Sequence, residues 1–339
     1  MKSCVLVFLR LKMNILKSSK TALKLQTIAF YNIENLFDIY DDEQTNDDDF
    51  LPTSTKKWTK KRYRKKIYKL GSAIVRIGFE SCDEPPALVG LAEVENDMVL
   101  KDLINSQDLS EYNYGFVHYD SNDERGIDVA LLYNRDEFAV ESSETFSIDI
   151  ETPEGERDFT RDILLVSGIL DGDSIHVIVN HWPSRRNGED GSSYKRIVAA
   201  KKLLEIIADL KGRYENPKII ILGDFNDNPN DDSVTYLIKN EDLFNPMENL
   251  WTSKRGSQNH DFRWNLFDQI IMSNNLLESR QNHYSFDSAN IFDDKFVTQH
   301  HGKYKGQPFR TYVGTKYMGG FSDHFPVYVQ LKKQNPLNN

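Results

Sequence analysis

The stretch from Ile219 to Asp227 reads IIILGDFND and joins a buried strand to a set of polar side chains. Its four leading apolar residues, of which three are β-branched, are typical of a short strand buried in a sheet. The strand should end at Gly223, and a carboxylate at Asp224 and an amide at Asn226 follow directly. Aspartate and asparagine are depleted from strand interiors, so at a strand end they indicate a terminator, a ligand or a catalyst.

Other apolar runs of strand length also meet polar residues at one end. In chain order, the polar residues that follow or open such runs are Asn32, Glu93, Asp128, His181, Asp224, Asp268, Asp323 and His324. Strands that donate carboxylates, amides and imidazoles to one edge of a sheet would assemble an oxygen-rich metal site. The sequence therefore predicts a functional site whose members lie far apart along the chain.

Two segments have apolar residues at three- and four-residue steps, which predicts amphipathic helices over 59–77 and 194–210. Strands that alternate with a few helices indicate sheets covered by helices, an α/β or α+β layered fold. The sequence has no internal repeat, low-complexity block or Pro/Gly-rich linker, so we expect a single domain over residues 23–333. Residues 1–22 are expected to be a disordered or vestigial extension, and residues 334–339 a short tail.

The composition is that of an ordinary soluble globular protein, with 39% hydrophobic and 28% charged residues in a chain of 339. The formal net charge of −10 argues against sequence-independent binding to nucleic acid, which rests on clustered Lys and Arg. It does not exclude an enzyme that holds one phosphodiester locally. Cys4 and Cys82 are the two cysteines, so the sequence encodes neither a disulfide framework nor a CxxC zinc pattern.

The cellular location is not settled by the sequence. The N-terminal apolar stretch is interrupted by Arg10 and Lys12 before a signal-peptide core can form, and no apolar run is long enough for a membrane helix. A cytoplasmic location is slightly favoured. A secreted or periplasmic one would follow if the N-terminus were a degenerate signal.

The types of polar residue at the strand ends favour phosphate chemistry with a hard metal ion. Asn32 and Glu34 are two residues apart, as are Asp224 and Asn226, so each pair would share a face of an extended segment. Carboxylate and amide oxygens without thiolates suit Mg²⁺ or Mn²⁺ rather than zinc. Such an ion neutralises charge that develops on a phosphoryl group and lowers the pKa of bound water. Histidines beside these carboxylates can transfer protons or donate to a phosphate oxygen.

The chain resembles the endonuclease/exonuclease/phosphatase superfamily in seven successive segments: IAFYNIEN, LAEVEN, RGIDVALLYN, VNHWPSR, ILGDFND, FDQIIMS and GGFSDHFPV. This metal-dependent phosphoesterase fold is shared by pancreatic deoxyribonuclease, exonuclease III-type repair enzymes and inositol phosphatases. The segments span residues 27–331 in the family's order, and they are most similar to uncharacterised bacterial-type nuclease members. The resemblance implies a deoxyribonuclease I-like four-layer α/β/β/α sandwich of two packed mixed β-sheets.

The resemblance also implies a role for each matching residue. The metal ligands would be Asn32, Glu93 and Asp323. Asp224 would orient or deprotonate the attacking water, with Asn226 beside it.

Two histidines would complete the catalytic group. His324 resembles the family's C-terminal histidine, with Asp268 to fix its tautomer. His181 resembles the second histidine of the deoxyribonuclease-like branch, for which Asp128 would be the acidic partner. The sequence departs from the family pattern at Glu34 and in the WPSRR that follows His181.

Each of these assignments has a simpler competitor. Asp224 and Asn226 could only cap the following segment, which is rich in turn-forming residues. His181 could be a hydrogen-bonded core histidine, and Asp128 could simply bond a nearby backbone amide. Glu95 competes with Glu93 as the metal ligand, although strand alternation favours Glu93.

Candidate substrate-binding residues come from the basic segments. The run 56–69 holds nine Lys or Arg residues together with three aromatic residues, which we interpret as the solvated face of a helix rather than a nucleic-acid surface. The segment 300–317 feeds directly into the SDH motif and offers Arg310 as the first candidate for a phosphate contact. Arg185 and Arg125 come next, and a mobile surface loop is the competing interpretation of 300–317.

These observations predict a Mg²⁺- or Mn²⁺-dependent phosphoesterase, and specifically a nuclease that cuts phosphodiester bonds by single-step attack of water. Its expected partner is a DNA or RNA substrate, with no membrane span and no obligate protein partner. The main alternative is a phosphodiesterase or phosphatase that acts on a small or lipid-linked phosphate. A catalytically silent binding module of the same fold is the third hypothesis.

Overall fold

Strand β10 (Ile219–Asp224) shows how one short apolar run joins two layers of the fold. Ile219 and Ile221 belong to the apolar cluster beneath helix α5 (Glu189–Arg213), whereas Ile220 and Leu222 belong to the larger cluster of the main core. Successive side chains of a strand point to opposite faces, so a strand that is buried on both faces needs an unbroken apolar run.

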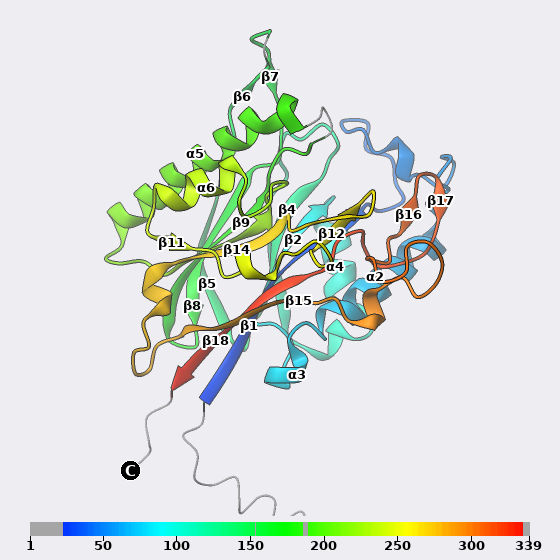
Figure 1. Ribbon diagram of the computed structural model, residues 1–339. Helices are drawn as coiled ribbons and strands as arrows, with labels where there is room; N and C mark the ends of the chain where they lie inside the picture. The colour runs from blue at the N-terminus through cyan, green and yellow to red at the C-terminus, as the bar shows by residue number, and fades with distance from the viewer. Residues whose placement is uncertain (1–22, 153, 186–188, 335–339) are drawn as a thin grey trace, which may run out of the picture.

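The computed structural model describes residues 23–152, 154–185 and 189–334 (Figure 1). One six-stranded sheet has the order β15 (Ser285–Ile291), β18 (Val327–Gln334), β1 (Leu23–Leu36), β2 (Leu88–Val94), β4 (Asp128–Asn134) and β3 (Tyr114–His118). The other has the order β11 (Leu243–Phe244), β14 (Asp268–Ser273), β10, β9 (Asp173–His181), β8 (Ile163–Leu170) and β5 (Phe138–Phe146). Both sheets are mixed, because β1 pairs with β2 and β9 with β10 in parallel while the other neighbours are antiparallel.

Helices cover the outer faces of the two sheets (Figure 1). Helices α2 (Lys60–Ile74) and α4 (Asp97–Ile104) lie over the first sheet, and α5 and α6 (Asp232–Lys239) lie over the second. The predicted four-layer α/β/β/α sandwich is confirmed, and the two predicted helices correspond to α2 and α5. The remaining helical elements are α3 (Phe79–Cys82), η1 (Asp48–Phe50), η2 (Leu109–Glu111), η3 (Glu248–Leu250), η4 (Asn274–Leu277) and η5 (Lys295–Val297).

Three two-stranded hairpins lie outside the main sheets. They are β6 (Ile150–Glu151) with β7 (Arg157–Asp158), β12 (Gln258–His260) with β13 (Arg263–Asn265), and β16 (Tyr312–Val313) with β17 (Lys316–Tyr317). The second and third of these lie towards the end of the sandwich at which β1 and β2 terminate (Figure 1).

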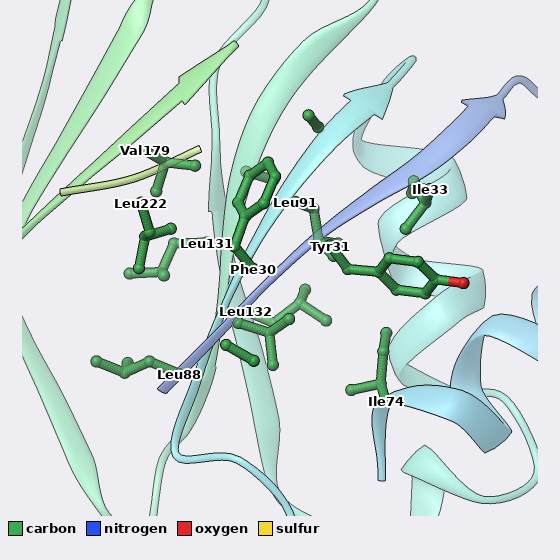
Figure 2. Close-up of a cluster of buried hydrophobic side chains, with 14 of the residues drawn as sticks. Phe30, Tyr31, Ile33, Ile74, Leu88, Leu91, Leu131, Leu132, Val179 and Leu222 are labelled. Atoms are coloured by element: carbon green, nitrogen blue, oxygen red, sulfur yellow. The ribbon is translucent and has the colours of Figure 1, made fainter. Parts of the chain in front are cut away.

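Side chains from both sheets fill the space between them. Phe30 points from β1 towards Val179 and Leu222 of the second sheet, while its neighbour Tyr31 points the other way, towards α2 (Figure 2). Gly90 has no side chain here because a Cβ would lie 1.9 Å from a methyl carbon of Leu222. The close contact between the sheets fixes the positions of the strand ends that carry the polar residues.

The first and last strands described are neighbours, since Leu23 pairs with Gln334. The predicted N-terminal extension, residues 1–22, lies outside the described residues, and so does the predicted tail apart from Gln334, which ends β18. None of the helices in the described ranges is long and apolar enough to cross a membrane.

Candidate active site

Strand register places three of the predicted residues side by side. Asp224, the last residue of β10, pairs with His181 of β9 on one side and with Asp268 of β14 on the other. The Asp224 Oδ2 accepts a 3.0 Å hydrogen bond from the Asn32 amide, and its Oδ1 accepts one of 2.9 Å from the backbone N–H of Asn226. Because Asn32 belongs to the first sheet, the site spans both sheets at their common edge.

The environment of Asp224 suits it to proton transfer. Burial raises the pKa of Asp224 to about 6, and the nearby charge of Asp268 adds to this rise. The charge of His324 and the hydrogen bonds from Asn226 and Asn32 act in the opposite direction. A carboxylate with a pKa close to neutrality is ionised at physiological pH and still accepts a proton readily.

His324 and Asp268 form a buried pair beside Asp224. The His324 Nδ1 lies 2.7 Å from Asp268 Oδ2. Burial alone would lower the pKa of His324, but the charges of Asp268, Asp224 and Asp323 outweigh it and raise the pKa well above the usual value. The raised pKa favours the imidazolium form of His324, in which Nδ1 is held by Asp268 and Nε2 lies 3.4 Å from the amide nitrogen of Gln258.

Arg310 and Asp323 form a half-buried rim of the site. The Arg310 Nη2 lies 2.5 Å from Asp323 Oδ2. Burial tends to raise the pKa of Asp323, but the charges of His324 and Arg310 lower it below the usual value. The segment 300–317 thus places an arginine beside Asp323, one of the predicted metal ligands.

Glu93 occupies a second part of the site, next to Arg125. The Glu93 Oε2 accepts a 2.7 Å hydrogen bond from the backbone N–H of Asn35, whose side-chain oxygen accepts one of 2.6 Å from Arg125. The Glu95 Oε2 instead accepts a hydrogen bond from the backbone N–H of Asp38. Burial raises the pKa of Glu95 to about 8, so it is largely neutral and a poor metal ligand. The geometry favours Glu93 over Glu95.

Lys66 lies beneath the site and is buried, contrary to our interpretation of the run 56–69 as a solvated face. Its ammonium donates to the carbonyl oxygens of Glu34 (3.0 Å) and Phe321 (2.8 Å) and to the hydroxyl of Thr311 (2.5 Å). These bonds join the end of β1 to the segment that carries Arg310 and to the segment before β18 that carries Asp323.

Glu34 is the second residue whose role sequence reasoning missed. Its carboxylate accepts hydrogen bonds from the backbone N–H groups of Thr311 and Tyr312, at 2.6 and 3.2 Å. Burial and the charge of Asp323 raise the pKa of Glu34 to about 7, and burial lowers the pKa of Lys66 to about 8. For Lys66 a signal was available, because it lies three residues after Tyr63 on the apolar stripe of its helix.

Arg185 and Asn226 are two further predicted residues, and both have structural partners. Arg185 donates to the carbonyl of Asn226 (2.7 Å) and to the carboxylates of Asp227 (2.6 Å) and Asp231 (2.5 Å), and its guanidinium lies over the ring of Phe267. These contacts hold the turn that follows β10. Asn226 adopts a positive φ of 51° in that turn, and its amide donates to the Trp182 carbonyl at 3.0 Å.

Asp128 contacts His118 and not the predicted partner, His181. The Asp128 Oδ2 lies 3.8 Å from His118 Nε2, and its Oδ1 accepts a backbone hydrogen bond from Ser121. The register explains this position. Gly90 faces the second sheet and pairs with Leu131, so Asp128, three residues before Leu131, lies on the opposite face.

The sequence profile of the Endonuclease/Exonuclease/phosphatase family matches residues 27–333, which is most of the chain. The chain belongs to this family. Its members hydrolyse phosphoester bonds, so the chain is a phosphoester hydrolase, and the family typically depends on a divalent metal ion. No protein of curated function matches the chain in sequence.

Solved structures with the same fold come from bacteria and animals. An endonuclease/exonuclease/phosphatase family protein from Bacteroides thetaiotaomicron has a TM-score of 0.58 at 18% identity, covering 91% of this chain and 98% of that one. A mannosyl-6-phosphatase from the same species has 0.55 at 18%, covering 90% and 99%. D. rerio TDP2 complexed with a single-strand DNA product has 0.53 at 14%, covering 91% and 98%. At these identities the likeness shows the fold alone.

The donor groups of this family member fit a hard divalent ion. Glu93 and Asp323 offer carboxylate oxygens, and both lie close enough to Lys66 for their charges to raise its pKa. Cys82, the cysteine among the described residues, bonds the Leu25 carbonyl instead. Burial and, after it, the charge of Asp323 raise the pKa of Glu34, so a second carboxyl group lies close to Asp323. Ligand atoms of Asp224, Asp268 and His324 also lie within 4.8 Å of one another. Hydrogen bonds already hold both Asp224 oxygens and join Asp268 Oδ2 to His324 Nδ1, and among the described residues Asp268 Oδ1 has no hydrogen-bond partner.

Two cavities flank the Arg310–Asp323 pair. One has a volume of about 180 Å³ and is lined by Asn259, Phe262, Gln299, Lys303, Tyr304 and Gln307, among others. The other has a volume of about 190 Å³ and is lined by Glu34, Asn35, Phe50, Lys56, Tyr312 and Gly314. Both contain Arg310 and Asp323 in their walls, so a phosphate bound at this pair would have space on each side.

Proposed function

We propose that this family member is a divalent-metal-dependent phosphodiesterase of the nuclease type. The observation that carries the proposal is the pair of cavities on either side of Arg310 and Asp323. A phosphodiester has two substituents, and each would occupy one cavity while the phosphate contacts the arginine. A phosphomonoester would need only one of them.

In this proposal Asp224 orients the attacking water and accepts its proton. The pKa of about 6 keeps Asp224 ionised at neutral pH. His324, held as an imidazolium by Asp268, would donate from Nε2 to a phosphate oxygen as negative charge develops. Arg310 and Arg125 would contribute further positive charge at the rim.

His181 would protonate the leaving oxygen. Its Nε2 lies 3.8 Å from Asp224 Oδ2, so both side chains face the same space at the sheet edge. We assign the metal, Mg²⁺ or Mn²⁺, to Glu93 and Asp323. When bound there, it would neutralise charge on the phosphoryl group and lower the pKa of a bound water.

A nucleic acid is the substrate class that we favour, because two exposed aromatic rings lie beside the proposed phosphate site. Phe262 and Tyr304 lie in the first cavity with their rings nearly parallel, at an interplanar angle of 5° and a centroid distance of 5.7 Å. Both rings are exposed, and exposed aromatic faces beside a phosphate site are suited to stacking with bases. The bound single-strand DNA product in the TDP2 structure is consistent with this class.

A sugar phosphate monoester is the second candidate. A cavity of about 180 Å³ has room for one sugar or one base and not for a polymer. Asn259, Gln299 and Gln307 in its wall offer amides that suit sugar hydroxyls. The mannosyl-6-phosphatase with the same fold supports this alternative.

The two candidates separate in a substrate panel assayed with Mg²⁺ or Mn²⁺. The panel contains bis-p-nitrophenyl phosphate, p-nitrophenyl phosphate, a single-stranded oligonucleotide and mannose 6-phosphate. Diester and oligonucleotide hydrolysis should exceed monoester hydrolysis by at least about 10-fold in kcat/KM, and Asp224→Asn should lose all of these activities. Faster cleavage of the monoesters would favour the phosphatase function over the nuclease function. Wild-type rates in the Asp224→Asn variant would show that Asp224 does not belong to the active site.

A further inference from the structure

A second group of potential metal ligands lies on the outer side of the first sheet. His118 ends β3, Asp128 begins β4, and Asp120 lies in the connection between them. One atom from each of these side chains lies within 4.8 Å of the other two. None of the three has been given a role in the proposed reaction.

The imidazole of His118 is buried and oriented. Its side chain is only 2% exposed, and Nδ1 lies 3.2 Å from Oδ1 of Asp97, the first residue of α4. The opposite nitrogen, Nε2, has no hydrogen-bond partner among the described residues. A buried nitrogen of this kind requires an explanation, because leaving it unsatisfied is costly.

Asp128 presents one oxygen to that nitrogen. Its Oδ1 accepts the backbone N–H of Ser121 at 3.1 Å, which leaves Oδ2 at 3.8 Å from His118 Nε2. This separation is too long for a hydrogen bond. It is the separation of two ligands on one ion, because atoms about 2.0–2.2 Å from a shared metal are about 3–4 Å apart.

We propose that His118, Asp120 and Asp128 bind a divalent transition-metal ion of the Zn²⁺ class, separate from the catalytic metal. The donor set of one imidazole nitrogen and carboxylate oxygens suits Zn²⁺, whereas Mg²⁺ prefers oxygen ligands in an octahedron. Asp97 on Nδ1 supplies the carboxylate that commonly orients a metal-bound histidine. Water completes the coordination on the exposed side of Asp120.

The ion would fix a loop that reaches the catalytic edge. The loop between His118 and Asp128 carries Arg125, which donates to Asn35, and the Asn35 backbone donates to Glu93. An ion bound to both ends of this loop would hold the guanidinium of Arg125 near Glu93, the proposed ligand of the catalytic metal. The inference does not depend on which phosphoester is cleaved.

The test titrates the purified protein with Co²⁺ and Zn²⁺ in excess Mg²⁺, which occupies the oxygen-rich catalytic site. Visible absorption reports Co²⁺ bound to a nitrogen–oxygen site, and calorimetry gives the affinity for Zn²⁺. The wild type should bind one ion, and Asp97→Asn should weaken it by about 10- to 100-fold. Asp120→Asn, which removes a ligand, should weaken binding at least as much.

Two control variants separate this site from others. Glu93→Gln alters the catalytic metal ligand, and His283→Asn removes a histidine that has a single carboxylate partner, Asp173. Both should keep the Co²⁺ band. Absence of a band in the wild type, or a band that persists in His118→Asn and Asp120→Asn, would overturn the proposal. If His118→Asn does not fold, Asp120→Asn alone decides the test, because Asp120 is exposed and its substitution should leave the fold intact.

Discussion

Asn32 donates a 3.0 Å hydrogen bond to Asp224, and this bond joins strand β1 of the first sheet to strand β10 of the second. It is made to a carboxylate that has little access to water, so it contributes directly to keeping Asp224 ionised. The bond makes the acidity of Asp224 depend on how the two sheets pack.

Asn32→Ala should therefore shift the acidic limb of the pH–rate profile to higher pH. The hydrogen bond from Asn32 lowers the pKa of Asp224, so its loss raises the pKa above about 6. Activity at pH 7 should fall by about 10-fold or more, and part of it should return at pH 8. The measurement is kcat/KM against pH for both proteins. An acidic limb at the same pH in the variant would show that Asp224 does not control it.

His324 should control the alkaline limb of the same profile. Its pKa is raised well above the usual value by Asp268, Asp224 and Asp323, so it stays protonated through neutral pH and loses its proton only in the alkaline range. His324→Gln, which cannot carry the charge, should lower kcat by about 100-fold or more and flatten the alkaline limb. If His324→Gln kept the alkaline limb of the wild type, the group that loses its proton there would not be His324.

The strand ends that meet at the candidate site could be selected from the sequence because each lies beside an apolar run. Asn32, Asp224, Asp268 and His324 follow or open strands, and adjacent strands bring such residues together at one edge. Their pairing could be inferred only through the family resemblance, because register between distant strands is not encoded locally.

The residues that sequence reasoning placed differently owe their positions to long-range packing. Asp128 was paired with His181, but the face of the sheet on which it lies depends on where Gly90 meets the second sheet. Lys66 lies on the apolar stripe of α2, and only the arrival of the segment around Thr311 supplies its oxygen partners. A lysine without those partners would point to solvent.

Lys66→Met should destabilise the fold more than any change to the exposed lysines of α2. It leaves the carbonyls of Glu34 and Phe321 and the hydroxyl of Thr311 without their buried donor. Removing one member of a buried charged network costs about 3–5 kcal/mol. Urea denaturation measures this loss, with Lys65→Met, at an exposed neighbouring position, as the control. Equal stability of the two variants would contradict the role given to Lys66.

Glu93 and Glu95 provide a matched pair for testing the metal ligand. Chelation with EDTA should abolish activity, and Mg²⁺ or Mn²⁺ should restore it. Glu93→Gln should raise the metal concentration needed for half-maximal activity by about 10- to 100-fold, as loss of metal-site groups commonly does. Glu95→Gln should change it little, because the raised pKa of about 8 already keeps Glu95 largely neutral. A larger effect at Glu95 would reverse the assignment.

Phe262→Ala tests whether the substrate carries a base. The loss of one stacking ring should cost about 1–3 kcal/mol of binding per base, which is roughly 5- to 150-fold in KM for an oligonucleotide. The effect should vanish for an oligonucleotide that is abasic beside the scissile phosphate. Phe262→Trp should restore binding. Phe79→Ala, an exposed aromatic on α3, is the control. Equal losses on basic and abasic substrates would mean that Phe262 shapes the cavity wall without contacting a base.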